Sequence, residues 1–204
     1  MASRRDAILR AAAKEIARRG VRGLRVEEVA REAGVSLGLV YYHFTDRAGL
    51  LAETFSFVND RAAGYVAEAV AGAADARDRV VQQLLSELQE DPLVIDNSAA
   101  WGELRSSAIF EESLREPLRS TTERWIGAVA EAIRAAQAAG LADRRVDADA
   151  AAARLTALVE GLSDRWLSHS LELGQARELL AGAVDYELGP PAALESAHRP
   201  RELD

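Results

Sequence analysis

The stretch "VEEVAREAGVSLGLVYYHF", residues 26–44, constrains the fold more than any other part of the chain. Its first half predicts a short helix with one buried face, because apolar residues recur at three- and four-residue steps: Val26, Val29, Ala30 and Ala33. Gly34 can adopt the positive φ of a tight turn, and Ser36 can cap a following helix that runs to Phe44. Two short helices joined by about three residues with a glycine are typical of a helix-turn-helix motif.

Helical patterns flank this motif on both sides. The stretch from Ser3 to Arg19 predicts an amphipathic helix, and Gly20 is a stop signal for it. Asp46 is expected to cap a longer fourth helix, whose apolar stripe consists of Leu50, Leu51, Phe55 and Val58. Later helices are predicted at about 76–90, 93–109, 112–139, 147–172 and 175–188. The predicted fold class is all-α: a three-helix head at the N-terminus and a larger C-terminal helical bundle.

The patterns divide the chain into three parts. We predict a helix-turn-helix domain over residues 1–46, a helical ligand-binding and dimerisation domain over 47–188, and a disordered tail over 189–204. The chain has no cysteine, which excludes disulfides and thiolate metal sites. No apolar run approaches the roughly 20 residues that a membrane span needs. A cytoplasmic location without membrane contact is therefore expected.

Charge is distributed unevenly along the chain. The formal net charge is -8, yet residues 1–50 contain ten Lys and Arg residues against six acids, a balance of +4. The rest of the chain therefore carries -12. Attraction to phosphate is local, since charges are screened over about 8 Å at physiological salt. A basic head on an acidic body is thus compatible with binding a polyanion.

Residues 4–60 resemble the TetR family of bacterial transcriptional regulators. The resemblance is carried by "VEEVAREAGVS", by a recognition helix that ends in "YYHF", and by "TDRAGLL" at the start of the fourth helix. The "PLRSTTERW" region and the helices after it are more faintly similar to the choline-responsive repressors. The resemblance implies a homodimer that binds a palindromic double-stranded DNA operator. It also implies that a small-molecule effector, of unknown identity, releases the DNA.

The recognition helix has a buried face and an exposed face. We expect Val35, Val40 and Phe44 to pack inside the head. Packing alone favours half-buried positions for Tyr41 and Tyr42, whereas the resemblance implies that these tyrosines and His43 donate hydrogen bonds to phosphates. The predicted DNA-binding residues are Arg4, Arg5, Arg25, Ser36, Leu37, Gly38, Leu39, Tyr41, Tyr42, His43 and Arg47.

Two positions depart from the pattern common in the family. Leu37 stands where relatives often have lysine, and Arg25 stands where many have Thr or Ser as the cap of the second helix. Leu37 and Leu39 have no hydrogen-bonding group, so bidentate contacts to guanine or adenine are excluded for them. Recognition is expected to rest on thymine methyl contacts, on Tyr41 and on DNA shape, with arginines supplying charge.

The C-terminal helices contain all three tryptophans. Core packing explains most of these aromatic positions, and a ligand cavity is the functional alternative, with cation–π contacts to a cationic ligand as one version of it. The predicted ligand-binding residues are Trp101, Leu104, Phe110, Trp125, Trp166 and His169. The last two helices carry apolar stripes that predict the dimer interface: Leu155, Leu158, Val159, Leu162, Leu179, Leu180 and Val184. Packing within one chain is the alternative for these.

Nothing in the sequence indicates catalysis. His43, His169 and His198 are far apart, and no nucleophile motif, phosphate loop or metal-ligand spacing occurs. We therefore expect no enzyme activity, no cofactor and no metal. Three hypotheses remain: a ligand-responsive repressor, a constitutive DNA-binding dimer, and a helical small-molecule carrier or enzyme with a vestigial head.

Overall fold

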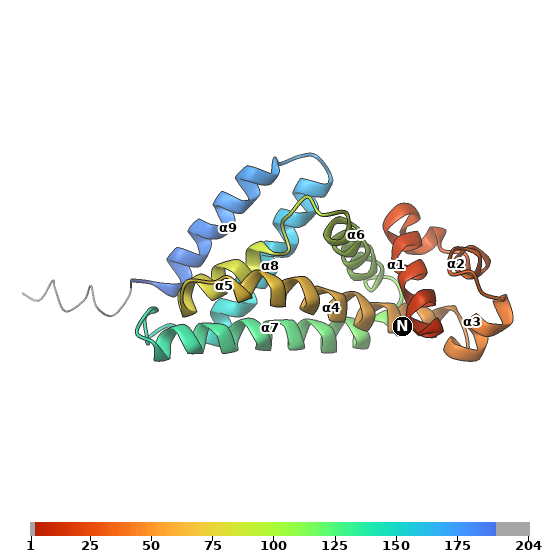
Figure 1. Cartoon of the computed structure of the whole chain (residues 1–204), viewed down its shortest axis with the longest axis horizontal. Coiled ribbons are helices and arrows are strands. Elements are labelled where there is room, and N and C mark those ends of the chain that lie inside the picture. Colours follow the sequence, from red (N-terminus) through yellow and green to blue (C-terminus); the bar gives the residue numbers. More distant parts are fainter. Residues whose placement is uncertain (1–2, 191–204) are drawn as a thin grey trace, which may run out of the picture. The chain divides into compact units, whose positions relative to one another are not determined.

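A computed structural model describes residues 3–190, and every regular element in that range is a helix (Figure 1). The predicted all-α class is confirmed. The chain forms two compact units: one contains the residues up to Tyr65 together with Gln89–Arg124, and the other contains Val66–Leu88 and the described residues from Trp125 onward. The functional division predicted at residues 46 and 47 stays a prediction. Of the tail predicted over 189–204, residues 191–204 lie outside the described part.

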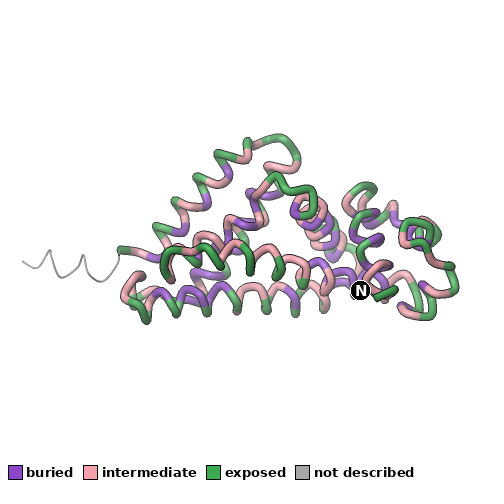
Figure 2. The backbone as a smooth tube through the Cα atoms, viewed as in Figure 1, coloured by how far each residue is buried: buried purple, intermediate pink, exposed green. Residues whose placement is uncertain are grey.

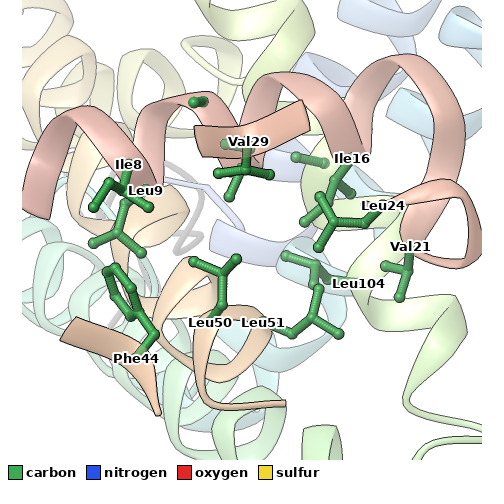
Figure 3. Close-up of a cluster of buried hydrophobic side chains, with 14 of the residues drawn as sticks. Ile8, Leu9, Ile16, Val21, Leu24, Val29, Phe44, Leu50, Leu51 and Leu104 are labelled. Carbon is green, nitrogen blue, oxygen red and sulfur yellow. The ribbon is translucent and has the colours of Figure 1, made fainter. Parts of the chain in front are cut away.

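The first unit combines the head with two later segments. Its elements are α1 (Arg4–Gly23), α2 (Val26–Glu32), α3 (Leu37–Phe44), the first part of α4 (Arg47–Ala71), α6 (Pro92–Ser107), the 3₁₀ helix η1 (Glu112–Leu114) and the first residues of α7 (Arg115–Ala138). Figure 3 shows apolar side chains of α1, α2, α3 and α4 pointing toward one another, with Leu104 of α6 facing them. The three-helix head therefore shares one core with α4 and α6.

Local capping explains where the helices of the head begin. Ser3 and Asp6 form a capping box at the start of α1, with each side chain bound to the other residue's backbone N–H. The Ser36 hydroxyl accepts from the Leu39 N–H at 3.2 Å, as predicted. Asp46 accepts from the Gly49 N–H at 2.7 Å, which confirms it as the cap of α4. Gly20 has a φ of 72° and interrupts α1, so the predicted stop is also confirmed.

The second unit is a separate helical cluster. It contains the end of α4, α5 (Ala76–Leu85), most of α7, α8 (Ala148–Leu167) and α9 (Leu173–Leu188). Within it, α9 packs against both α8 and α5. Along α8 and α9, buried positions alternate with exposed ones at helical spacing (Figure 2). Aspartates cap α5 and α8, where Asp75 and Asp147 accept from backbone N–H groups of the first turn.

Three predicted helices end or begin at other residues. The helix predicted to reach residue 90 ends at Leu85, because the Arg177 guanidinium donates to the carbonyl groups of Leu85 and Leu88 and so satisfies the helix end. The segment at 112–139 begins with one turn of 3₁₀ helix before α7. The helix predicted to reach residue 172 ends at Leu167, where the Ser168 and Ser170 hydroxyls donate to the Arg165 carbonyl.

Arg77 joins distant segments of the second unit and gives a prediction about stability. Its guanidinium donates to the carbonyls of Leu141 at 3.0 Å and Gly189 at 2.9 Å, and it pairs with Asp185 at 2.9 Å. Arg77→Ala would leave these partly buried acceptors without their donor, and we expect it to lower the free energy of unfolding by about 2 kcal/mol. Urea unfolding measures this effect. Arg79→Ala, which changes an exposed arginine of the same helix, should change stability by less than about 0.5 kcal/mol.

Candidate nucleic-acid interface

The recognition helix α3 presents one face to the core and the other to solvent. Val40 is 1% exposed and Phe44 is 4% exposed, and Val35 packs against the same core, as predicted. On the opposite side Tyr42 is 81% exposed and Tyr41 is 44% exposed. The half-buried alternative for Tyr42 is therefore wrong. Leu37 and Gly38 are also exposed, while Leu39 and His43 are half-buried. The six residues of α3 that were predicted for DNA binding therefore share this surface or its margin.

Aromatic contacts order the C-terminal end of α3. The Tyr42 and His43 rings lie 5.3 Å apart in an edge-to-face arrangement, and the His43 ring lies 6.0 Å from the ring of Phe44. Because Phe44 is buried, this chain of rings connects the exposed tyrosine to the core. An ordered phenol loses less entropy when its hydroxyl binds a phosphate oxygen.

A sharp turn separates α3 from α4. Thr45 has a φ of 59°, an uncommon value for a residue other than glycine. A side chain at position 49 would overlap the Phe44 carbonyl oxygen, so the turn requires Gly49. This turn explains why α3 ends at Phe44 and α4 begins only three residues later.

The arginines predicted for phosphate binding fall into two groups. Arg4 and Arg25 are exposed and form no ion pair within residues 3–190. Arg25 occupies the cap position of α2 without a side-chain capping bond, as its departure from the family pattern predicts. Arg5 instead pairs with Glu53 at 2.6 Å and lies over the Phe44 ring at 5.5 Å. Arg47 is bound to the Val21 carbonyl at 2.5 Å.

Two of the three acids of α2, Glu28 and Glu32, are compensated by neighbouring cations, whereas Glu27 is exposed and forms no ion pair within residues 3–190. Glu28 pairs with Arg31, and this hydrogen bond holds the pKa of the Glu28 carboxyl below its ordinary value. Lys14 pairs with Glu32 and lowers the pKa of that carboxyl in the same way. Both acids therefore remain ionised near physiological pH, and the charge of each is balanced by its paired cation. Their repulsion of a phosphate backbone is therefore reduced.

The predicted ligand-binding residues have different surroundings. In the first unit Leu104 is fully buried in the core, Trp101 is half-buried with its ring edge-on to Phe55 at 5.6 Å, and Phe110 is 73% exposed under the Arg22 guanidinium. In the second unit Trp125 and Trp166 are half-buried against its core. His169 is exposed and has a φ of 58° just after α8. A ligand role for this set stays a prediction.

The residues predicted for the dimer interface divide between core and surface. Five are buried within their own unit: Leu155, Val159, Leu162, Leu180 and Val184. Leu158 is half-buried and Leu179 is 54% exposed. Sequence periodicity identified the buried face of each helix but missed the opposite face. There α8 exposes Ala153, Ala157 and Gly161, and α9 exposes Leu179, Gly182 and Tyr186.

Other kinds of site are not formed by the described residues. Within residues 3–190 no group of three or more His, Cys, Asp or Glu side chains is arranged to hold a metal ion. In the same range no helix combines the length and the apolar character that a membrane crossing requires.

Comparisons with known proteins agree with the helix-turn-helix assignment. Residues 8–54 match the family model of bacterial regulatory proteins of the tetR family, and residues 73–189 match the model of the BetI-type transcriptional repressor C-terminal part. The HTH-type transcriptional regulator BetI of Rhizobium meliloti is 30% identical over 115 residues, which span 56% of this chain and 57% of that protein. The chain thus aligns with little more than half of that relative's length.

Solved structures extend the similarity over nearly the whole chain. A protein from Rhodococcus sp., assigned as a TetR-family transcriptional regulator, is 51% identical, with a TM-score of 0.88 over 93% of this chain and 100% of that one. A protein from Saccharomonospora viridis, assigned as a transcriptional regulator and solved in complex with choline, is 28% identical, with a TM-score of 0.77 over 90% of this chain and 96% of that one. With its exposed recognition helix and these matches, the chain belongs to the TetR family of bacterial transcriptional regulators, and its C-terminal part is of the BetI-type repressor class.

Proposed function

We propose that the chain is a ligand-responsive repressor, which binds a palindromic operator as a homodimer and is released by a small molecule bound in its C-terminal part. The observation that carries the DNA-binding half is the exposed face of α3, where Tyr42 is 81% exposed; the same head contains Arg4 and Arg25, which form no ion pair with any described residue. Such a role places the protein in the cytoplasm. Selection of bound duplexes from random DNA by the full chain tests it, and a palindromic consensus is the expected result.

The exposed tyrosine supplies the most direct test of the DNA surface. Tyr42→Phe removes one hydroxyl that we expect to donate to a phosphate, so affinity should fall by about 1 kcal/mol for selected and unrelated duplexes alike. Fluorescence anisotropy with both duplexes measures this. Tyr186→Phe changes an equally exposed tyrosine of α9, 87% exposed, and should leave affinity unchanged. Equal affinity of Tyr42→Phe and the unmodified protein would exclude this phosphate contact.

The proposed dimer uses the outward faces of α8 and α9. The two helices pack on each other, and the Arg154–Glu187 ion pair, at 2.5 Å, joins them. Ala153, Ala157 and Gly161 recur at four-residue steps on the exposed face of α8. Small residues allow helices of two subunits to approach closely, and the exposed Leu179 and Tyr186 of α9 add apolar area. Leu158, half-buried beside this stripe, remains within the proposed interface.

We propose choline, or a related quaternary ammonium compound, as the effector. The support is the relative from Saccharomonospora viridis, which is 28% identical and was solved with choline, together with the match to the BetI-type C-terminal part. Aromatic faces bind such cations through cation–π contacts. Trp125 and Trp166 of the second unit are half-buried and so retain ring surface that a ligand can contact.

Calorimetry with choline tests the effector and its chemistry together. The neutral isostere 3,3-dimethylbutanol has the same shape without the charge, and we expect it to bind at least about tenfold more weakly, because desolvated cation–π contacts are worth about 2 kcal/mol. Trp125→Leu and Trp166→Leu should each weaken choline binding by a similar factor and weaken binding of the isostere clearly less, because the isostere loses apolar contact but no cation–π contact. If no heat of binding is detected with choline, choline is excluded as the effector. Equal affinity for choline and the isostere would remove the cation–π argument.

The two alternative functions make different predictions. A constitutive DNA-binding dimer would select a palindrome that no quaternary ammonium compound releases. A helical small-molecule carrier would bind choline without binding DNA at low salt. The exposed recognition surface favours a DNA-binding role over the carrier.

A further inference from the structure

The interruption of α1 takes the backbone of one buried residue, Val21, out of the regular helical hydrogen-bond ladder. Gly20 has φ 72° and ψ 167°, so the helical hydrogen-bond ladder breaks at Val21, which is fully buried. A buried N–H or C=O group without a partner is costly. Leu24 N–H supplies one bond to the Val21 carbonyl at 3.2 Å. The other two bonds to Val21 come from charged side chains far along the chain.

The first of these side chains belongs to α6. Glu103 accepts a hydrogen bond from the Val21 N–H at 3.3 Å. The same carboxylate lies so close to Gly20 that a β-carbon there would be 2.7 Å from Glu103 Oε2. Glycine at position 20 therefore has two roles: it adopts the positive φ, and it leaves room for the glutamate. The carboxylate holds α6 against the turn of α1.

The second side chain belongs to the residue that opens α4. Arg47 Nη2 donates to the Val21 carbonyl at 2.5 Å, and Arg47 Nη1 lies 3.6 Å from Glu111 Oε2 in the segment between α6 and η1. Arg47 follows the recognition helix by only three residues, across the tight turn at Thr45. Fixing its side chain therefore fixes the end of α3 relative to α1.

We propose that Glu103 and Arg47 are positioning residues for DNA binding, which act through Val21 and do not touch DNA. Arg47 is among the arginines predicted to contact phosphate, so this inference, which rests on the proposed DNA-binding function, assigns it a different role. Both backbone polar groups of one buried residue, Val21, serve as the joint. Through it α6 and the start of α4 hold the recognition helix in place.

The salt dependence of binding separates the two roles of Arg47. Each lost phosphate contact reduces the slope of log affinity against log salt by about 0.9, hence by about 2 for a dimer. We expect Arg47→Ala to weaken binding of the selected duplex roughly tenfold at every salt concentration between about 50 and 200 mM, and to change that slope by much less than the loss of a phosphate contact does. Arg25→Ala, at an unpaired arginine, is the reference for a lost phosphate contact. A slope that falls by about 2 in Arg47→Ala would overturn the proposal.

For Glu103, the direction in which DNA affinity changes distinguishes a positioning role from an electrostatic effect. Removing an acid should strengthen DNA binding through long-range electrostatics, and Glu112→Ala, an exposed glutamate of η1, measures that effect. We expect Glu103→Ala instead to lower the affinity for the selected duplex several-fold. Glu103→Gln keeps an acceptor for the Val21 N–H, so its affinity should stay within about twofold of that of the unmodified protein. If Glu103→Ala strengthens binding as Glu112→Ala does, or if the Gln variant is as weak as Ala, the proposal is wrong.

A double variant tests whether the two residues act through one joint. Since both residues bond to Val21, the double variant Glu103→Ala/Arg47→Ala should show a fold-loss in DNA affinity clearly smaller than the product of the fold-losses of the two single variants. Strict additivity would overturn the shared joint. The Glu103 series remains decisive even if Arg47→Ala unfolds, which urea unfolding detects. Failure of the unmodified protein to bind any selected duplex would instead refute the proposed DNA-binding function itself.

Discussion

Replacing Gly161 by arginine is expected to convert the dimer into monomers and to lower affinity for the selected operator by at least about a thousandfold. Gly161 lies on the exposed face of α8, and a β-carbon there would meet no atom within 4 Å other than its neighbouring residues and the nearby backbone of its own helix. The single chain therefore tolerates a larger residue. In the proposed dimer the same position lies between subunits, where an unpaired guanidinium would be buried at high cost. A monomer keeps only one half-site contact and loses specific binding.

Sedimentation measures the oligomeric state, and anisotropy measures operator affinity. Gly64→Arg is the matched control, because Gly64 is an exposed helical glycine of α4 whose β-carbon would also meet nothing within 4 Å. Replacing a helical glycine should if anything stabilise each helix, so Gly64→Arg should not unfold more easily, and the Gly161→Arg monomer should remain helical by circular dichroism even though it has lost the stabilisation that dimerisation gives. A Gly161→Arg protein that remains dimeric would place the interface elsewhere. A monomer with unchanged affinity would show that one head suffices.

The head was predicted almost completely from sequence because its determinants are local. Ser36 and Asp46 each cap a helix through a backbone group three residues away, and the positive φ of Gly20 breaks α1 where the glycine occurs. Periodicity likewise identified the buried side of α3, including Val40 and Phe44. Such signals depend on only a few neighbouring residues, so they can be recognised in a single sequence.

Features that depend on distant residues could not be predicted in this way. The end of α5 is set by Arg177, 92 residues after Leu85 in the sequence. Arg47 was predicted as a phosphate-binding arginine, and nothing in the neighbouring sequence indicates that its guanidinium also bonds to the Val21 carbonyl. The stripes on α8 and α9 told which face is apolar, but not that Leu155 and Leu180 are buried by their own chain. Periodicity indicates which face of a helix is buried, but it does not tell whether that face packs against the same chain or against a second subunit.

Choline is expected to lower operator affinity roughly 150-fold at saturation, which corresponds to about 3 kcal/mol of coupling. The structural motivation is α4, which starts three residues after the recognition helix and contributes residues to both compact units. Its residues Leu50, Leu51, Phe55 and Val58 are buried in the core of the head. In the proposed dimer a shift of α4 would change the separation of the two recognition helices, which must match half-sites about 34–36 Å or a multiple of one turn apart.

Linkage makes this prediction testable from either side. If choline weakens operator binding by a given factor, operator must weaken choline binding by the same factor, because both describe one free-energy difference between two states of the dimer. Calorimetric titration of choline into the free dimer and into the dimer saturated with selected operator should therefore give dissociation constants about 150-fold apart. An unrelated duplex at equal concentration is the control. Identical constants in the two titrations would mean that choline binding and operator binding are independent, and the chain would then be a DNA-binding dimer without induction by this ligand.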